Sequence, residues 1–223
     1  MNSQNTLTRF GENVPGYEVP VLNEREIRAS AGILFVLMFM SLVFILFKED
    51  FLLIKYFIIL FLTDLMVRVF INPKFSPLLI IGRLIVSRQA PEYVAAAPKK
   101  FAWKIGIGLA GMMFFLLDIV NSYSIITGMS CIICLVFLFF ESSFGICLGC
   151  MIYGWFYKDK VQLCPGEICT ERKKEDIQKT SGTQVLVLLG LVAYIVLLVV
   201  LLKDHFSTNP RNLWAIARTI WNG

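Results

Sequence analysis

Five long apolar blocks dominate this chain of 223 residues. A helix needs about 20 mostly apolar residues to cross a bilayer, with roughly 17 as the lower limit. Because 57% of all residues are hydrophobic, the chain has more apolar surface than a soluble fold of this size can bury. The sequence therefore predicts an all-α fold, a polytopic bundle of membrane helices. The blocks that reach the required length are 31–47, 51–71, 101–127, 129–157 and 184–202.

The basic residues alternate between the connections of these blocks. The first 30 residues contain three Lys or Arg, the connection 72–100 contains five and the loop 158–183 contains six, whereas the turn 48–50 contains only one and the turn 122–128 none. Basic connections stay in the cytoplasm. Five crossings of the membrane then leave the N-terminus inside and the C-terminus outside. Basic patches interleaved with surface aromatics are absent from the sequence, which argues against nucleic acid as a partner and leaves the lipid bilayer.

The chain divides into a four-helix core and several smaller segments. Two connecting pieces have apolar patterns too short to span: 76–88, predicted as a helix at the cytoplasmic face or a re-entrant segment, and 213–221, predicted as a helix on the outer leaflet. The predicted segments are a cytoplasmic N-terminal segment (1–30), the transmembrane core (31–157), a cysteine-containing loop (158–183), a fifth membrane helix (184–202) and an outer interfacial tail (203–223).

Six cysteines fall in three close pairs. The pairs are Cys131 and Cys134 (CIIC), Cys147 and Cys150 (CLGC), and Cys164 and Cys169 (CPGEIC). Residues three apart on a helix share a face, so a Cys-x-x-Cys pair can close a disulfide or hold one metal. Buried cysteine also behaves as a small hydrophobic residue, and this interpretation is favoured for CIIC, which has no polar neighbours.

CLGC and CPGEIC are expected to lie near each other at the cytoplasmic edge of the membrane. Four thiols there favour thiol–disulfide exchange or sulfur transfer between the pairs. A four-thiolate zinc site is an alternative, since thirteen residues separate the pairs, and ordinary packing is another. One objection concerns the thiolate: if 129–157 is a single helix, CLGC lies near its C-terminal end, where the helix dipole opposes negative charge.

Charged residues from neighbouring helices are candidates to support the pair. Counting from the cytoplasmic ends places Arg68 and Lys104 at about the depth of Cys150. The same count places Asp64 at about the depth of Cys147. Asp64 and Arg68 have the i,i+4 spacing of an ion pair. Both cations could instead snorkel to the interface.

Glu141 lies near the middle of the predicted fourth helix. It is nine residues from Cys150, so the two would occupy opposite faces of a straight helix unless the intervening glycines bend it. A hydrogen bond to Asp118 or Asn121, or a role in proton relay, is therefore the expectation for Glu141.

Four stretches of the chain resemble a bacterial membrane-protein family, domain of unknown function 4395. They are VLNEREIRASAGILF (21–35), INPKFSPLLIIGRLIV (71–86), APKKFAWKIG (97–106) and FGICLGCMIY (144–153). The resemblance covers about residues 20 to 155 and implies an integral membrane protein with four helices and no assigned reaction. The CPGEIC pair and the fifth helix lie outside it.

These observations lead to three hypotheses of function. The first is a membrane thiol protein that relays electrons or sulfane sulfur through its paired cysteines to a cytoplasmic thioredoxin-like or sulfurtransferase partner, with no cofactor required. The second is a transporter or channel for a small sulfur species, with CLGC in a path lined by Asp64, Arg68 and Glu141. The third is a membrane scaffold with a thiolate–metal clasp, for which zinc is the candidate metal.

Overall fold

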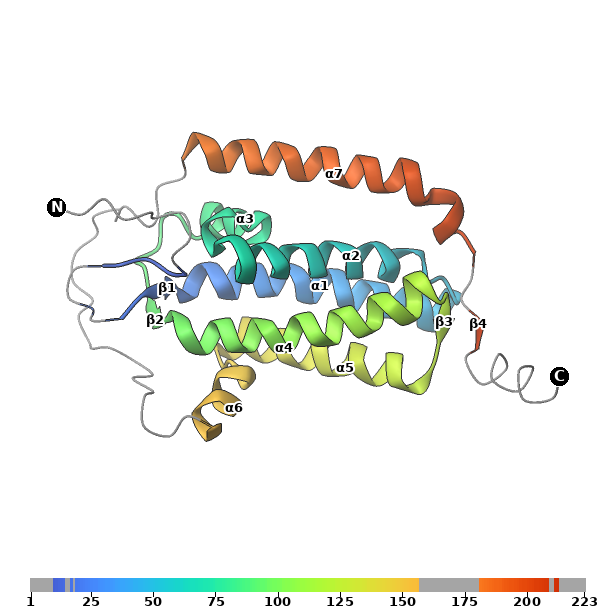
Figure 1. Cartoon of the computed structure of the whole chain (residues 1–223), viewed down its shortest axis with the longest axis horizontal. Helices are drawn as coiled ribbons and strands as arrows, with labels where there is room; N and C mark the ends of the chain where they lie inside the picture. Colours follow the sequence, from blue (N-terminus) through green and yellow to red (C-terminus); the bar gives the residue numbers. More distant parts are fainter. Residues whose placement is uncertain (1–9, 15–16, 18, 157–180, 209–210, 213–223) are drawn as a thin grey trace.

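The computed structural model describes residues 10–14, 17, 19–156, 181–208 and 211–212 (Figure 1). Cys164, Cys169 and the predicted helix at 213–221 lie outside the described residues. The expectation that the two cytoplasmic cysteine pairs approach each other therefore stays a prediction.

Helix α1 (Glu24–Lys48) begins seven residues before the apolar block that predicted it. Asn23 explains this early start, because its side chain accepts a hydrogen bond from the Arg25 backbone N–H at 3.2 Å. Two glutamates follow in the first turn, where the helix dipole favours negative charge. The helix ends at Glu49, whose φ of 53° lies in the left-handed region. The first predicted membrane segment is thus longer than its apolar part.

Three of the following helices end in a π-helical turn. These are α2 (Leu52–Met66) with η1 (Val67–Ile71), α4 (Ala96–Phe114) with η3 (Phe115–Ile119), and α5 (Ile125–Phe139) with η4 (Phe140–Phe144). Each turn contains an ionisable residue: Arg68, Asp118 and Glu141 respectively. Wider turns of this kind occur often at functional sites.

The remaining elements are short, with one exception. They are η2 (Pro73–Phe75), α3 (Pro77–Ile85), α6 (Leu148–Phe156), the long α7 (Gly182–Phe206) and the strands β1 (Val21–Asn23), β2 (Tyr93–Ala95), β3 (Ser122–Tyr123) and β4 (Arg211–Asn212). Strands β1 and β2 pair antiparallel, and β3 and β4 pair parallel.

Helices α1, α2, α4 and α5 run alongside one another, with α7 along the α2 and α3 side (Figure 1). Helix α3 accounts for most of the predicted interfacial segment at 76–88 and packs against α1. The approach is close: a Cβ added at Gly82 would lie 2.5 Å from the Glu26 carbonyl oxygen. The exposed face of α3 includes Leu84 and Ile85.

Four helices among the described residues are long and apolar enough to cross a membrane, which indicates a membrane protein. They are Glu24–Lys48, Ala96–Ile119, Ile125–Phe144 and Gly182–Phe206. Helix α2 with η1 has the length of the predicted second crossing but contains three buried charged residues, Lys55, Asp64 and Arg68. The protein is therefore a mostly helical bundle with several candidate membrane helices.

Candidate functional site

The prediction of one continuous helix over 129–157 is wrong. Helix α5 and η4 end at Gly145, whose φ of +68° is left-handed, and α6 begins at Leu148. The N–H groups of Gly145 and Ile146 donate to the Glu141 and Phe140 carbonyls at 3.2 and 3.1 Å and close the helix end. Glycine adopts this conformation without the steric cost that a Cβ brings. The chain therefore changes direction two residues before CLGC.

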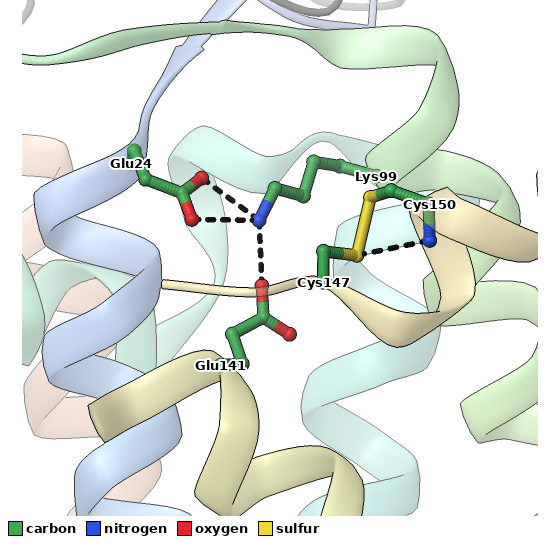
Figure 2. The surroundings of a disulfide bond; sticks show 5 residues. All are labelled: Glu24, Lys99, Glu141, Cys147 and Cys150. Carbon is green, nitrogen blue, oxygen red and sulfur yellow. Dashed lines mark hydrogen bonds and ion pairs between the residues drawn. A yellow bond between two sulfur atoms is a disulfide. The ribbon is translucent and has the colours of Figure 1, made fainter. Parts of the chain in front are cut away.

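Cys147 and Cys150 form a disulfide at the start of α6 (Figure 2). Cys147 precedes the helix and is partly exposed, whereas Cys150 is buried in its first turn. The Cys150 backbone N–H donates to Cys147 Sγ at 3.2 Å, and the Cys147 carbonyl accepts from Met151 N–H at 3.1 Å. The pair thus lies at a helix N-terminus, which removes the objection that the helix dipole opposes a thiolate here.

Helix α6 packs closely against α4. A Cβ added at Gly149 would lie 2.5 Å from Ala102 Cβ, so no side chain fits between the two helices at this point. The rings of Phe101 and Tyr153 lie 5.5 Å apart one turn further along α6. Gly149 therefore fixes the position of the disulfide relative to α4, because a small residue allows the two helices to approach closely.

Lys99, near the start of α4, lies between two carboxylates (Figure 2). Its Nζ is 2.9 and 2.8 Å from the two oxygens of Glu24 on α1 and 2.7 Å from Glu141 Oε1 on η4. The expectation that Glu141 bonds to Asp118 or Asn121 is wrong, because those residues follow the other end of α4, where Asn121 accepts a hydrogen bond from Lys55 at 2.8 Å. The break at Gly145 also brings Glu141 to the cysteine side of the bundle.

Arg68 is buried in a second polar cluster and does not snorkel. It pairs with Asp64 at 2.5 Å, as their spacing predicts, and donates to Ser76 Oγ at 3.2 Å and Ser30 Oγ at 2.9 Å. Its guanidinium also lies 5.1 Å from the centroid of the Trp103 ring. These contacts tie the end of α2 to α1 and α4 and satisfy the buried charge.

A cavity of about 60 Å³ connects these groups. Most of its wall is apolar and comes from α1, α2, α4 and α5. Four chemically active side chains also line it: Cys147, Glu141, Arg68 and Cys134. The predicted site residues Cys147, Glu141 and Arg68 therefore share one cavity, and Asp64 reaches it through Arg68.

Two other predicted residues, Lys104 and Cys131, do not line this cavity. Lys104 is exposed on α4 and is not among the residues that line it. Cys131 and Cys134 are free thiols buried in the core, and Cys131 Sγ lies 3.3 Å from Met113 Sδ. Within the described part of the chain, no group of three or more Cys, His, Asp or Glu could hold a metal ion. The predicted four-thiolate zinc site includes Cys164 and Cys169 and is therefore not tested.

Two residues of the site were missed from the sequence, Lys99 and Glu24. Lys99 belongs to a Lys-Lys pair that indicated a cytoplasmic connection, and its burial depends on α1 and η4, which are distant in the chain. The helix break had a local signal: two serines followed by Gly145 in ESSFG, a composition typical of helix ends and kinks.

The fold and the site define a helical membrane protein with a Cys-x-x-Cys disulfide at the edge of an internal cavity. The chain belongs to the family described as Domain of unknown function (DUF4395), which it matches over residues 22–158. This match confirms the resemblance found in the sequence and covers the bundle from α1 to α6 together with the disulfide, while α7 lies outside it. No curated protein and no solved structure matches the chain.

Proposed function

We propose that the protein is a membrane thiol–disulfide exchange protein in which Cys147 and Cys150 are the reactive pair. The observation that carries this proposal is the placement of the pair at the N-terminus of α6, with the Cys150 N–H directed at Cys147 Sγ. In the reduced protein the same N–H would stabilise a Cys147 thiolate.

The two cysteines take different roles because their exposure differs. Cys147 is partly exposed and attacks the disulfide of a partner, which forms a mixed disulfide and releases one partner thiolate. Cys150 is buried behind it and then attacks Cys147 Sγ, which closes the internal disulfide and releases the second partner thiolate. Two protein thiols become one disulfide and the partner disulfide becomes two thiols. A persulfide on Cys147 is resolved in the same way, with hydrosulfide as the leaving group.

The partner is proposed to be a cytoplasmic thioredoxin-like or sulfurtransferase protein. Lys and Arg are concentrated at the start of α1 and in residues 72–100, which lie at the same end of the bundle as α6 (Figure 1). By the positive-inside rule this end is cytoplasmic, with five crossings of the inner membrane and the C-terminus outside. Cys164 and Cys169 would serve as a second exchange pair in the loop after α6.

Trapping of the exchange intermediate tests this proposal. The Cys150→Ser variant keeps the attacking thiol and should accumulate a mixed disulfide at Cys147 with a thioredoxin-like protein, visible as a mass shift that reductant reverses. The Cys147→Ser variant should give no such adduct. The Cys134→Ser variant is the matched control, because Cys134 is buried on the same cavity, and its exchange should equal that of the wild type. Equal adducts in both CLGC variants, or none in either, would contradict the proposal.

A transporter for a small sulfur anion is a second candidate function. The cavity supports it, since Arg68 supplies a buried cationic side chain to the same cavity as Cys147 and the apolar wall excludes larger polar solutes. In vesicles that contain the protein, uptake of labelled thiosulfate should then be lost in the Cys147→Ser variant. Uptake that is independent of Cys147 would eliminate this candidate and leave the exchange reaction.

A further inference from the structure

The Lys99 cluster has one more negative than positive charge. Lys99 is 3% exposed and lies between two carboxylates, Glu24 and Glu141. Glu24 binds Lys99 through both oxygens, whereas Glu141 uses only Oε1. These three charges, two buried and one partly buried, sum to −1, so the cluster becomes neutral when it accepts one proton.

Glu141 is the member of the cluster that can exchange this proton with the cysteines. It lines the same cavity as Cys147, and its Oε2 has no hydrogen-bond partner among the described residues. The cavity volume of about 60 Å³ exceeds the roughly 10–15 Å³ that one water needs, and Glu141, Arg68 and Cys147 provide polar partners. A water in the cavity can therefore bridge the carboxylate and the sulfur.

We propose that Glu141 is the proton acceptor and donor for the Cys147–Cys150 pair, held in position by the Lys99–Glu24 ion pair. This inference rests on the proposed exchange function. The Cys147 thiol transfers its proton to the Glu141 carboxylate as it becomes a thiolate and attacks the partner disulfide. The neutral carboxylic acid then protonates the departing partner thiolate and is ionised again. The same cycle serves Cys150 in the second step, so protons and electrons balance.

Lys99 and Glu24 are positioning residues in this scheme. When Glu141 is ionised, Lys99 neutralises part of its charge. When Glu141 is protonated, Lys99 and Glu24 still form a neutral ion pair, so neither state leaves an isolated buried charge. Two further cations face this region: Arg28 from α1, which donates to the Ser143 carbonyl at 3.4 Å, and Arg68 from η1, which is matched by Asp64.

Kinetics of disulfide formation in the purified full-length protein test the role of Glu141. The reduced protein in detergent micelles is oxidised with glutathione disulfide, and closure of Cys147–Cys150 is followed by alkylation and mass spectrometry over a range of pH. Glu141→Gln should slow closure at neutral pH by about tenfold or more, a loss typical of general acid–base groups. One titrating step of the wild-type pH profile should disappear in this variant. Glu24→Gln should also slow closure, by less, because it removes the excess negative charge.

Glu26→Gln is the matched control. Glu26 lies on α1, is as buried as Glu24, and also pairs with a cation, Arg83 at 3.1 Å. It does not line the cavity of the disulfide. Its rate and pH profile should equal those of the wild type. Glu141→Asp keeps the carboxylate on a shorter side chain, so closure should be slower but should keep the titrating step of its pH profile. This variant tests the role of Glu141 if Glu141→Gln does not fold.

The outcomes separate the two proposals. A wild-type pH profile in Glu141→Gln, or a wild-type rate in Glu141→Asp, overturns the role of Glu141 and leaves the exchange reaction intact. A wild-type Cys147–Cys150 pair that does not react with glutathione at any pH overturns the proposed function itself.

Discussion

At the scale of single side chains, the structure of the site depends most on Lys99. The Lys99→Met variant would leave the buried Glu24 carboxylate and the partly buried Glu141 carboxylate without their cation, so it should lower the free energy of unfolding by about 3–5 kcal/mol. Thermal unfolding in detergent micelles measures this effect. Lys104→Met on the same helix is the control, because Lys104 is exposed and its loss should change stability by less than about 0.5 kcal/mol. Equal stability of the two variants would show that the Lys99 ion pairs contribute little.

Residue spacing predicted one of the two charge clusters that contribute a side chain to the cavity wall. Asp64 and Arg68 are four apart on one helix, so their pairing follows from helix geometry alone. The second cluster joins positions that are 75 and 42 residues apart in the chain. Only the packing of α1, α4 and η4 brings these positions together, and no local pattern contains that information. The sequence therefore singled out Glu141 as an acid within an apolar helix but did not identify its partner.

At the scale of elements, the break between α5 and α6 determines the chemistry of the cysteines. Apolar residues on both sides of Gly145 gave a hydrophobic pattern that continues through the break, so the sequence predicted one helix. A hydrophobic pattern reports burial in the bilayer or the core, and it does not report a change of direction by a single left-handed residue. The ESSFG composition was the available signal. The structure has a long helix within each of the five predicted apolar blocks, with boundaries displaced by up to several residues.

Substitutions at Gly145 test whether this break controls thiol reactivity. Asn tolerates a positive φ, whereas β-branched Val does not. Both side chains add the same Cβ, about 3.1–3.3 Å from the Arg28 guanidinium, so the comparison isolates the backbone conformation. Gly145→Val should slow alkylation of Cys147 by iodoacetamide in the reduced protein, because α6 loses its position and the thiolate loses the helix N-terminus. Gly145→Asn should stay close to the wild type. Equal rates in the two variants would contradict this role of the break.

At the scale of the whole molecule, α7 is an addition to the family core. It lies outside the matched residues and runs along the α2 and α3 side of the bundle (Figure 1). Hydrogen bonds spread along its length connect it to the core. Gln184 donates to the Lys74 carbonyl at 3.0 Å, Tyr194 and Thr63 share a hydrogen bond of 3.1 Å, and His205 Nε2 lies 3.0 Å from the Asp118 carbonyl oxygen. Since lipid is as apolar as the surface of α7, such polar contacts are an effective way to attach a helix in a membrane.

The proposed orientation of the bundle in the membrane can be tested at its two ends. If the chain crosses five times from a cytoplasmic N-terminus, as proposed, Lys48 at the end of α1 lies outside and Ala90, between α3 and β2, lies inside. Both residues are exposed, so single cysteines at these positions can be labelled. In a background with the six native cysteines replaced by serine, a membrane-impermeant maleimide should label Lys48→Cys in intact cells. Lys48→Cys also removes the single basic residue of the outer turn, which strengthens the charge asymmetry.

Ala90→Cys should react only after the membrane is opened, because it lies at the same end of the bundle as β1 and β2. Permeabilised cells, in which both positions should be labelled, provide the control for reagent access. Labelling of Ala90→Cys but not Lys48→Cys in intact cells would reverse the orientation. The disulfide and its cavity would then face the outside, and the partner of Cys147 would have to be a protein of that compartment, where thiols are oxidised rather than kept reduced.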